Sequence, residues 1–155
     1  MLIGQAPNKT GDPGVPLEGR AGKKIAELFR ISFEEYLVRT HRTNIFPRFQ
    51  GKVGKGDRFP VDKAKKLVER LIVPKDVALV LLVGKNVASA FGIRDADYFD
   101  RRFLWSSGND ARVIEARIVP HPSGINRWWN DDKNRRTASR RFKSIASSVW
   151  NRRLV

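Results

Sequence analysis

The sequence contains no cysteine, and its only two histidines are His41 and His121. A chain without cysteine forms no disulfide, no iron–sulfur cluster and no cysteine-ligated zinc site. Two histidines are also too few for a typical histidine-based metal site. We therefore expect no metal and no cofactor, and any chemistry to be carried out by oxygen, nitrogen and backbone groups.

Long apolar runs are missing as well. The longest, residues 77–83, falls short of the roughly 18–20 residues that cross a bilayer, and it is typical of a buried strand. Residues 1–4 show neither the basic region nor the long apolar region of a signal peptide. We therefore expect no membrane-spanning segment and a cytoplasmic protein, bound to the nucleoid if the source is a bacterium.

Acidic side chains are scarce relative to basic ones. The chain has 31 lysines and arginines against 16 acidic residues, which gives a formal net charge of +15. Such an excess favours a polyanionic partner, either DNA, RNA or an acidic membrane surface, over a neutral metabolite. Its 155 residues match one ordinary domain. We expect residues 1–155 to form a single domain that acts as a monomer.

Apolar patterning alternates between short strands and helices. Strands are expected over residues 2–3, 42–46, 77–83, 103–105 and 113–119. Helices are expected over residues 25–29, 32–37, 61–72, 86–91 and 138–150, with a capping box of Ser32 and Glu35 opening the second. This order predicts an α/β fold, a three-layer α/β/α sandwich with a central, mainly parallel sheet of four or five strands.

Three loops follow expected strands, and ligands of open α/β sheets bind beyond the carboxyl ends of the strands. These loops are residues 4–8, 44–47 and 120–129, of which the last contains His121 between two prolines. Each part has an ordinary explanation taken alone. A lone histidine often caps or packs, Trp128 and Trp129 would fill a core, and Asn44 at a strand end suits a turn.

Taken together, the loops carry a more specific pattern. Residues 4–8 are Gly-Gln-Ala-Pro-Asn, and residues 121–127 are His-Pro-Ser-Gly-Ile-Asn-Arg. These segments resemble the two signature motifs of the uracil-DNA glycosylase superfamily. Residues 16–22, 43–45 and 82–88 are similar to thermophile-type members, although the cysteines of their iron–sulfur cluster are absent, and residues 121–127 also resemble mismatch-specific members. The resemblance implies an enzyme that flips a damaged base out of DNA and breaks its bond to the sugar.

The resemblance implies catalytic and base-binding roles for several residues. His121 would donate a hydrogen bond to the uracil oxygen on which negative charge develops as the base departs, a contribution of about 3–4 kcal/mol. Asn44 would pair with the polar edge of uracil, because an amide supplies both a donor and an acceptor. Gln5 stands where several members place an acidic residue or asparagine, and it would orient the attacking water through its amide; Asp12 and Glu18 are the nearest carboxylates.

Other positions of the expected base pocket depart from the family pattern. Leu17 stands where an aromatic residue stacks on uracil, and Phe46 is a candidate substitute. Ala6 and Asn8 would line the same pocket; Asn8 replaces the tyrosine with which one subgroup excludes thymine. These departures leave the identity of the base open among uracil, mismatched thymine and hypoxanthine.

The same resemblance assigns DNA contacts to the last loop. Ile125 occupies the position of the wedge that fills the space left by the flipped nucleotide. Ser123, Gly124, Asn126 and Arg127 would hold flanking phosphates, with Arg127 also placed for the widowed partner base. Residues 127–155 add nine basic and two acidic side chains, and residues 48–58 add four basic and one acidic. Either segment has an ordinary interpretation as a solvated face, and both suit a phosphate backbone.

Two further interpretations stay open beside a uracil-specific DNA-repair glycosylase without metal. One is an enzyme of the same fold that acts on mismatched thymine or hypoxanthine. The other is a protein that binds a flipped or single-stranded base without cleaving it, because the first motif has no evident general base. An RNA-binding role is less favoured, since no segment resembles an aromatic-rich RNA-recognition strand.

Overall fold

The structure is a computed structural model, and it describes residues 1–9, 15–106, 112–124 and 126–150. The chain forms two compact units. Unit 1 consists of Met1–Leu17 and His41–Val119, and unit 2 consists of Glu18–Thr40 and Pro120–Val155. Each unit is therefore built from two separate stretches of sequence.

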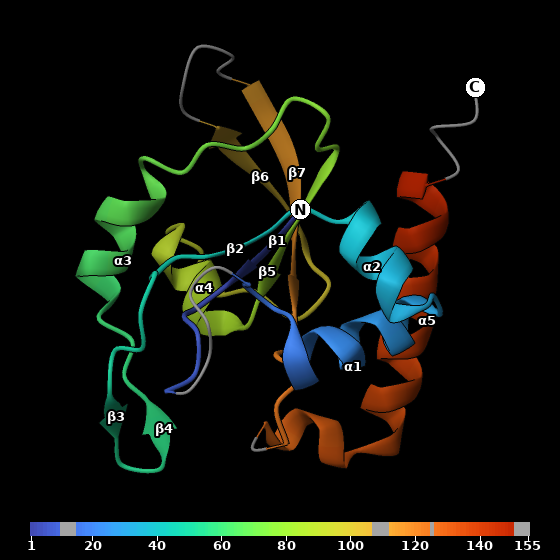
Figure 1. Cartoon of the computed structure of the whole chain (residues 1–155), viewed down its shortest axis with the longest axis horizontal. Helices are drawn as coiled ribbons and strands as arrows, with labels where there is room; N and C mark the ends of the chain where they lie inside the picture. Colours follow the sequence, from blue (N-terminus) through green and yellow to red (C-terminus); the bar gives the residue numbers. More distant parts are fainter. Residues whose placement is uncertain (10–14, 107–111, 125, 151–155) are drawn as a thin grey trace. The chain divides into compact units, whose positions relative to one another are not determined.

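Unit 1 contains a five-stranded sheet with the strand order β2-β1-β5-β7-β6 (Figure 1). In this order β2, β1, β5 and β7 run parallel to one another, and β6 runs antiparallel to β7 at the edge. The strands are β1 (Leu2–Gly4), β2 (Arg42–Asn44), β5 (Leu79–Val83), β6 (Arg101–Ser106) and β7 (Arg112–Val119). The α/β fold with a mainly parallel sheet is thus confirmed.

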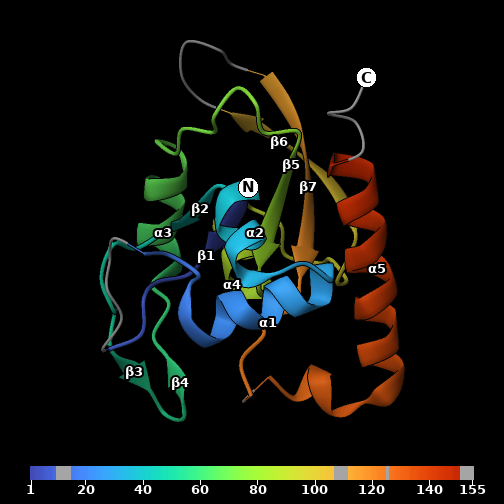
Figure 2. The ribbon, with the colours of Figure 1, turned by 45° about the vertical axis from the view of Figure 1, so that its right-hand side comes forward.

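Two helices of unit 1, α3 (Val61–Val68) and α4 (Lys85–Ala90), pack against one face of this sheet (Figures 1 and 2). The core between them contains Ile3, Leu82 and Ile118 from three adjacent strands. All five residues of β5 are buried, as expected for an apolar run in the centre of a parallel sheet. The strands β1, β5 and β7, which supply these buried apolar residues, are the three inner strands of the sheet.

The expected elements of unit 1 match the observed ends to within two residues, as for β2, which stops at Asn44 rather than at Phe46, apart from two larger differences. Helix α3 ends at Val68 rather than at Ile72, whose side chain is exposed. The chain turns after Val68 and reaches Pro74, and a helix seldom continues to the residue before a proline. A hairpin of β3 (Lys52–Val53) and β4 (Gly56–Asp57) was not expected; it turns at Gly54, where φ is +58°.

Unit 2 contains the helices α1 (Gly19–Phe29), α2 (Phe33–Arg39) and α5 (Asp132–Trp150) and a 3-10 turn, η1 (Arg127–Asn130). Helix α1 packs against α5, where the rings of Phe29 and Phe142 meet edge to face with centroids 5.1 Å apart. Among the described residues, no helix is long and apolar enough to cross a membrane.

The start of α2 was predicted correctly from the sequence, whereas the start of α5 was not. The capping box of Ser32 and Glu35 is confirmed, with each side chain accepting from the other residue's backbone N–H. Helix α5 begins at Asp132, six positions before the expected start at Ala138. Its first turn is polar, so apolar spacing does not reveal it, and the Asp131 carboxylate accepts from the Lys133 backbone N–H there.

Candidate functional site

The carboxyl ends of β1 and β2 lie side by side in unit 1. Gly4 pairs with Asn44 in register, and the Ile45 N–H donates to the Gly4 carbonyl at 2.9 Å. One residue further along, the Phe46 N–H donates to the Gln5 carbonyl, also at 2.9 Å. The first two loops of the sequence pattern are therefore fixed to one another just beyond the strands.

Gly4 lies beneath two of the expected base-binding side chains. A Cβ at this position would lie 2.4 Å from Asn44 Oδ1 and 3.0 Å from Leu17 Cδ2. Only a residue without a side chain leaves room for the Asn44 amide and the Leu17 side chain at the end of β1. Leu17 itself has a φ of +54°, a left-handed conformation that is uncommon outside glycine. The structure thus brings Gly4, Leu17 and Asn44 together.

The Gln5 amide connects three segments of unit 1. Its Nε2 donates to the Arg58 carbonyl at 3.4 Å, and its Oε1 accepts from Asn86 Nδ2 at 3.2 Å. The side chain is therefore held between the residue that follows β4 and the first turn of α4. Sequence reasoning missed both partners, because they lie 53 and 81 positions away along the chain.

The other expected pocket residues of unit 1 have different environments. Ala6 packs against the hydrophobic core, and Asn8 is exposed. Phe46 is 2% exposed, and its ring meets Phe59 edge to face with centroids 5.7 Å apart. Phe46 is therefore a core residue here, and its ring is used for packing. Asp12 lies outside the described residues.

The His121 loop of unit 2 fixes the tautomer of its imidazole. The Ser123 backbone N–H donates to His121 Nδ1 at 3.2 Å. A ring nitrogen that accepts a hydrogen bond carries no proton in the neutral form, so the neutral ring carries its proton on Nε2. The loop thereby makes Nε2–H the hydrogen-bond donor of the neutral ring.

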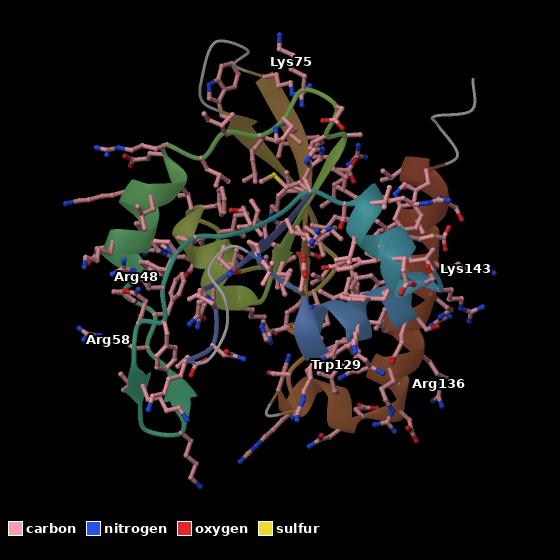
Figure 3. All side chains as sticks on the ribbon, in the orientation of Figure 1. Arg48, Arg58, Lys75, Trp129, Arg136 and Lys143 are labelled. Carbon is pink, nitrogen blue, oxygen red and sulfur yellow. The ribbon has the colours of Figure 1, made fainter. Side chains whose placement is uncertain are left out.

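Two side chains hold the backbone of this loop at His121. The His121 carbonyl accepts from Asn126 Nδ2 at 3.0 Å and from Trp129 Nε1 at 2.8 Å. Asn126 Oδ1 also accepts from the Trp128 backbone N–H, which caps η1. Both ends of the Asn126 amide are thus used within the loop. Trp129, labelled in Figure 3, acts as a support for the loop, a role that the sequence pattern did not suggest.

The other expected DNA contacts of this loop differ in exposure. Gly124 and Arg127 are exposed, and Ser123 is half-buried. Ile125, the expected wedge, lies outside the described residues. In the basic segment near the hairpin, Arg48 and Arg58 are exposed and extend outward, as Figure 3 shows.

No metal centre is evident in the part of the chain that the structure describes, which contains no group of three histidine, aspartate or glutamate side chains placed to hold an ion. Neither the protein-family models nor the curated proteins contain a match to this chain.

Proposed function

We propose that this protein is a DNA glycosylase that flips uracil, or a related deaminated base, out of DNA and hydrolyses its bond to deoxyribose. It acts as a monomer and needs no metal. The observation that carries this proposal is the His121 loop, in which the Ser123 N–H holds the imidazole with Nε2 as its donor nitrogen. A donor of this kind suits a reaction whose leaving group is an anion.

In the reaction, the bond between the sugar carbon and the base nitrogen breaks first; water then adds to that carbon and loses a proton to the solvent, which reprotonates the released base. The base departs with the bonding electrons, and negative charge develops on one of its carbonyl oxygens. The His121 Nε2–H donates to that oxygen, and the two donors on the His121 carbonyl keep the loop in place. One such preorganised donor contributes about 3–4 kcal/mol to the transition state.

Asn44 and Leu17 provide base recognition. The amide of Asn44 offers a donor and an acceptor, which match the adjacent imino and carbonyl groups of uracil. Cytosine presents a different arrangement at those positions and would leave the amide poorly paired. Leu17, above Gly4, supplies an apolar surface beside that amide in place of an aromatic ring.

Gln5 orients the attacking water in this scheme. Its amide is held by Arg58 and Asn86, so its direction is fixed, although an amide is a weak general base. This assignment fits a reaction in which the base departs before water attacks, because the resulting oxocarbenium-like sugar needs little help from a base.

The test is the release of free base from oligonucleotides that carry one uracil, one mismatched thymine or one hypoxanthine, as single and double strands. We expect uracil release that falls about 10²–10³-fold in His121→Ala, the usual loss for one such donor. His41→Ala is the matched control, because His41 pairs with Asp76 at 3.0 Å on an exposed part of unit 1. Its rate should equal that of the wild type.

A second candidate function is the recognition of a flipped base without cleavage. Gln5 favours it, because this residue is no carboxylate and both ends of its amide already have partners. Tight binding to the uracil-containing strand without release of any base, unchanged in His121→Ala, would establish this alternative and exclude the glycosylase.

A further inference from the structure

Helix α5 separates an apolar face from a basic one. Its buried residues are Ala138, Phe142, Ile145 and Ala146. At about 100° per residue, four exposed cations fall within an arc of about 80° on the opposite side of the helix. These cations, named here the α5 stripe, are Lys133, Arg136, Arg140 and Lys143. Figure 3 shows the side chains of Arg136 and Lys143 pointing outward from the helix.

The α5 stripe borders a shallow hollow in the surface of unit 2. Lys133, Arg136 and Arg140 line it together with Ser139. Arg30, at the end of α1, donates from Nη2 to Ser139 Oγ at 3.5 Å and adds a further cation beside the hollow. The lining thus consists of cations and one hydroxyl group, all of which can donate to an anion.

Carboxylates near the helix start are engaged elsewhere. Asp132 pairs with Arg135, and Asp131 caps the first turn through the Lys133 backbone N–H. Among the described residues, no ion pair involves a side chain of the α5 stripe. Like charges three and four positions apart on a helix repel one another. A bound anion would relieve that repulsion.

We propose that the α5 stripe binds the phosphates of duplex DNA independently of any damaged base, so that the protein also associates with undamaged DNA. Ten positions at 1.5 Å each give the stripe a length of about 15 Å. One strand of DNA carries a phosphate about every 3.4 Å along the axis, so this length matches about four phosphates. The choice of DNA over RNA rests on the proposed function.

The geometry divides the basic residues of α5 into two groups. Arg135 is held by Asp132 and by the Trp129 carbonyl, and Arg141 lies about 120° away from the centre of the stripe. Neither belongs to the α5 stripe, although each carries the same charge as its members. Position on the helix, rather than the net charge of the segment, therefore decides which cations bind the phosphates.

The test compares two triple variants on an undamaged duplex, with affinity measured as a function of salt concentration. The stripe variant is Lys133→Gln, Arg136→Gln and Arg140→Gln. The control removes the same charge from exposed helix positions outside the stripe, with Lys63→Gln, Lys66→Gln and Arg141→Gln. Glutamine keeps helix propensity close to that of lysine and arginine, and the melting temperature of each variant verifies folding.

We expect the stripe variant to reduce the slope of log K against log salt by about 2–3, because each phosphate contact contributes about 0.9. Its affinity at low salt should fall at least tenfold, and the control should change both quantities little. Equal changes in the two variants, or none, would overturn the inference. A loss confined to duplex RNA would overturn the assignment to DNA. Base release plays no part in this experiment, so its outcome is independent of the glycosylase proposal.

Discussion

At the scale of single residues, the proposed chemistry depends on which nitrogen of His121 carries the proton. The Ser123 N–H donates to Nδ1, and the Asn126 and Trp129 side chains hold the carbonyl of the same residue. These contacts come from residues within the loop itself. A short segment therefore prepares the donor before any substrate binds, which is what electrostatic preorganisation requires.

The tautomer of His121 is directly measurable. Nitrogen-15 NMR of a ¹⁵N-histidine-labelled His41→Ala variant contains one imidazole, because the sequence has no third histidine. We expect the neutral ring to show an unprotonated Nδ1 and a protonated Nε2. A neutral ring protonated at Nδ1 would contradict the role assigned to the Ser123 N–H.

Gly4 allows a second prediction at this scale. In Gly4→Ala the new Cβ meets Asn44 Oδ1 at 2.4 Å, so the amide or the backbone must shift. We expect a loss of about 1–3 kcal/mol in the free energy of unfolding, typical of overpacking, together with at least a tenfold slower uracil release. Chemical denaturation and single-turnover kinetics measure the two effects.

Gly56→Ala is the matched control for this substitution. The nearest atom to its added Cβ is the Val53 carbonyl oxygen at 4.0 Å, and the position has ordinary space. If Gly4→Ala has the same stability and the same rate of uracil release as this control, then the position of the Asn44 amide beside Gly4 is not required for either property.

At the scale of helices and strands, the sequence predicted those elements that have a clear signal within their own residues. The capping box of α2 was readable because its two residues lie three positions apart, and β5 was readable because its uninterrupted apolar run is itself typical of a buried strand. The hairpin of β3 and β4 and the start of α5 were missed, since both are short or polar and lack apolar spacing.

The capping box gives a prediction for α2. Ser32→Ala removes the side-chain acceptor of the Glu35 N–H, which lies 3.0 Å from Ser32 Oγ. We expect the free energy of unfolding to fall by about 1 kcal/mol, as for other N-cap substitutions, in a urea titration. Ser147→Ala, at an exposed position inside α5, should change stability far less. Equal losses in the two variants would mean that the cap does not stabilise the helix.

At the scale of the whole molecule, charge and fold class were predictable and the details of the candidate site were not. A net charge of +15 and alternating strands and helices are properties of the sequence alone. The left-handed Leu17, the engaged amide of Gln5 and the burial of Phe46 depend on contacts between distant segments. No local pattern encodes such contacts, so only a three-dimensional structure reveals them.

A charge of this size also sets the conditions for testing the proposed glycosylase activity. Affinity for DNA should decline steeply as salt rises, because each neutralised phosphate releases bound counterions. Assays at low salt with protein in excess over DNA ensure that substrate is bound. Under those conditions, an absence of product reports on chemistry rather than on weak binding.

A single-turnover incubation with a duplex that carries one uracil, followed by quantification of free uracil and abasic sites, tests the glycosylase proposal most directly. We expect one free base and one abasic site for each uracil, with release slowed about 10²–10³-fold in His121→Ala and unchanged in His41→Ala. Intact uracil in DNA that is fully bound by the wild-type protein would contradict the proposal.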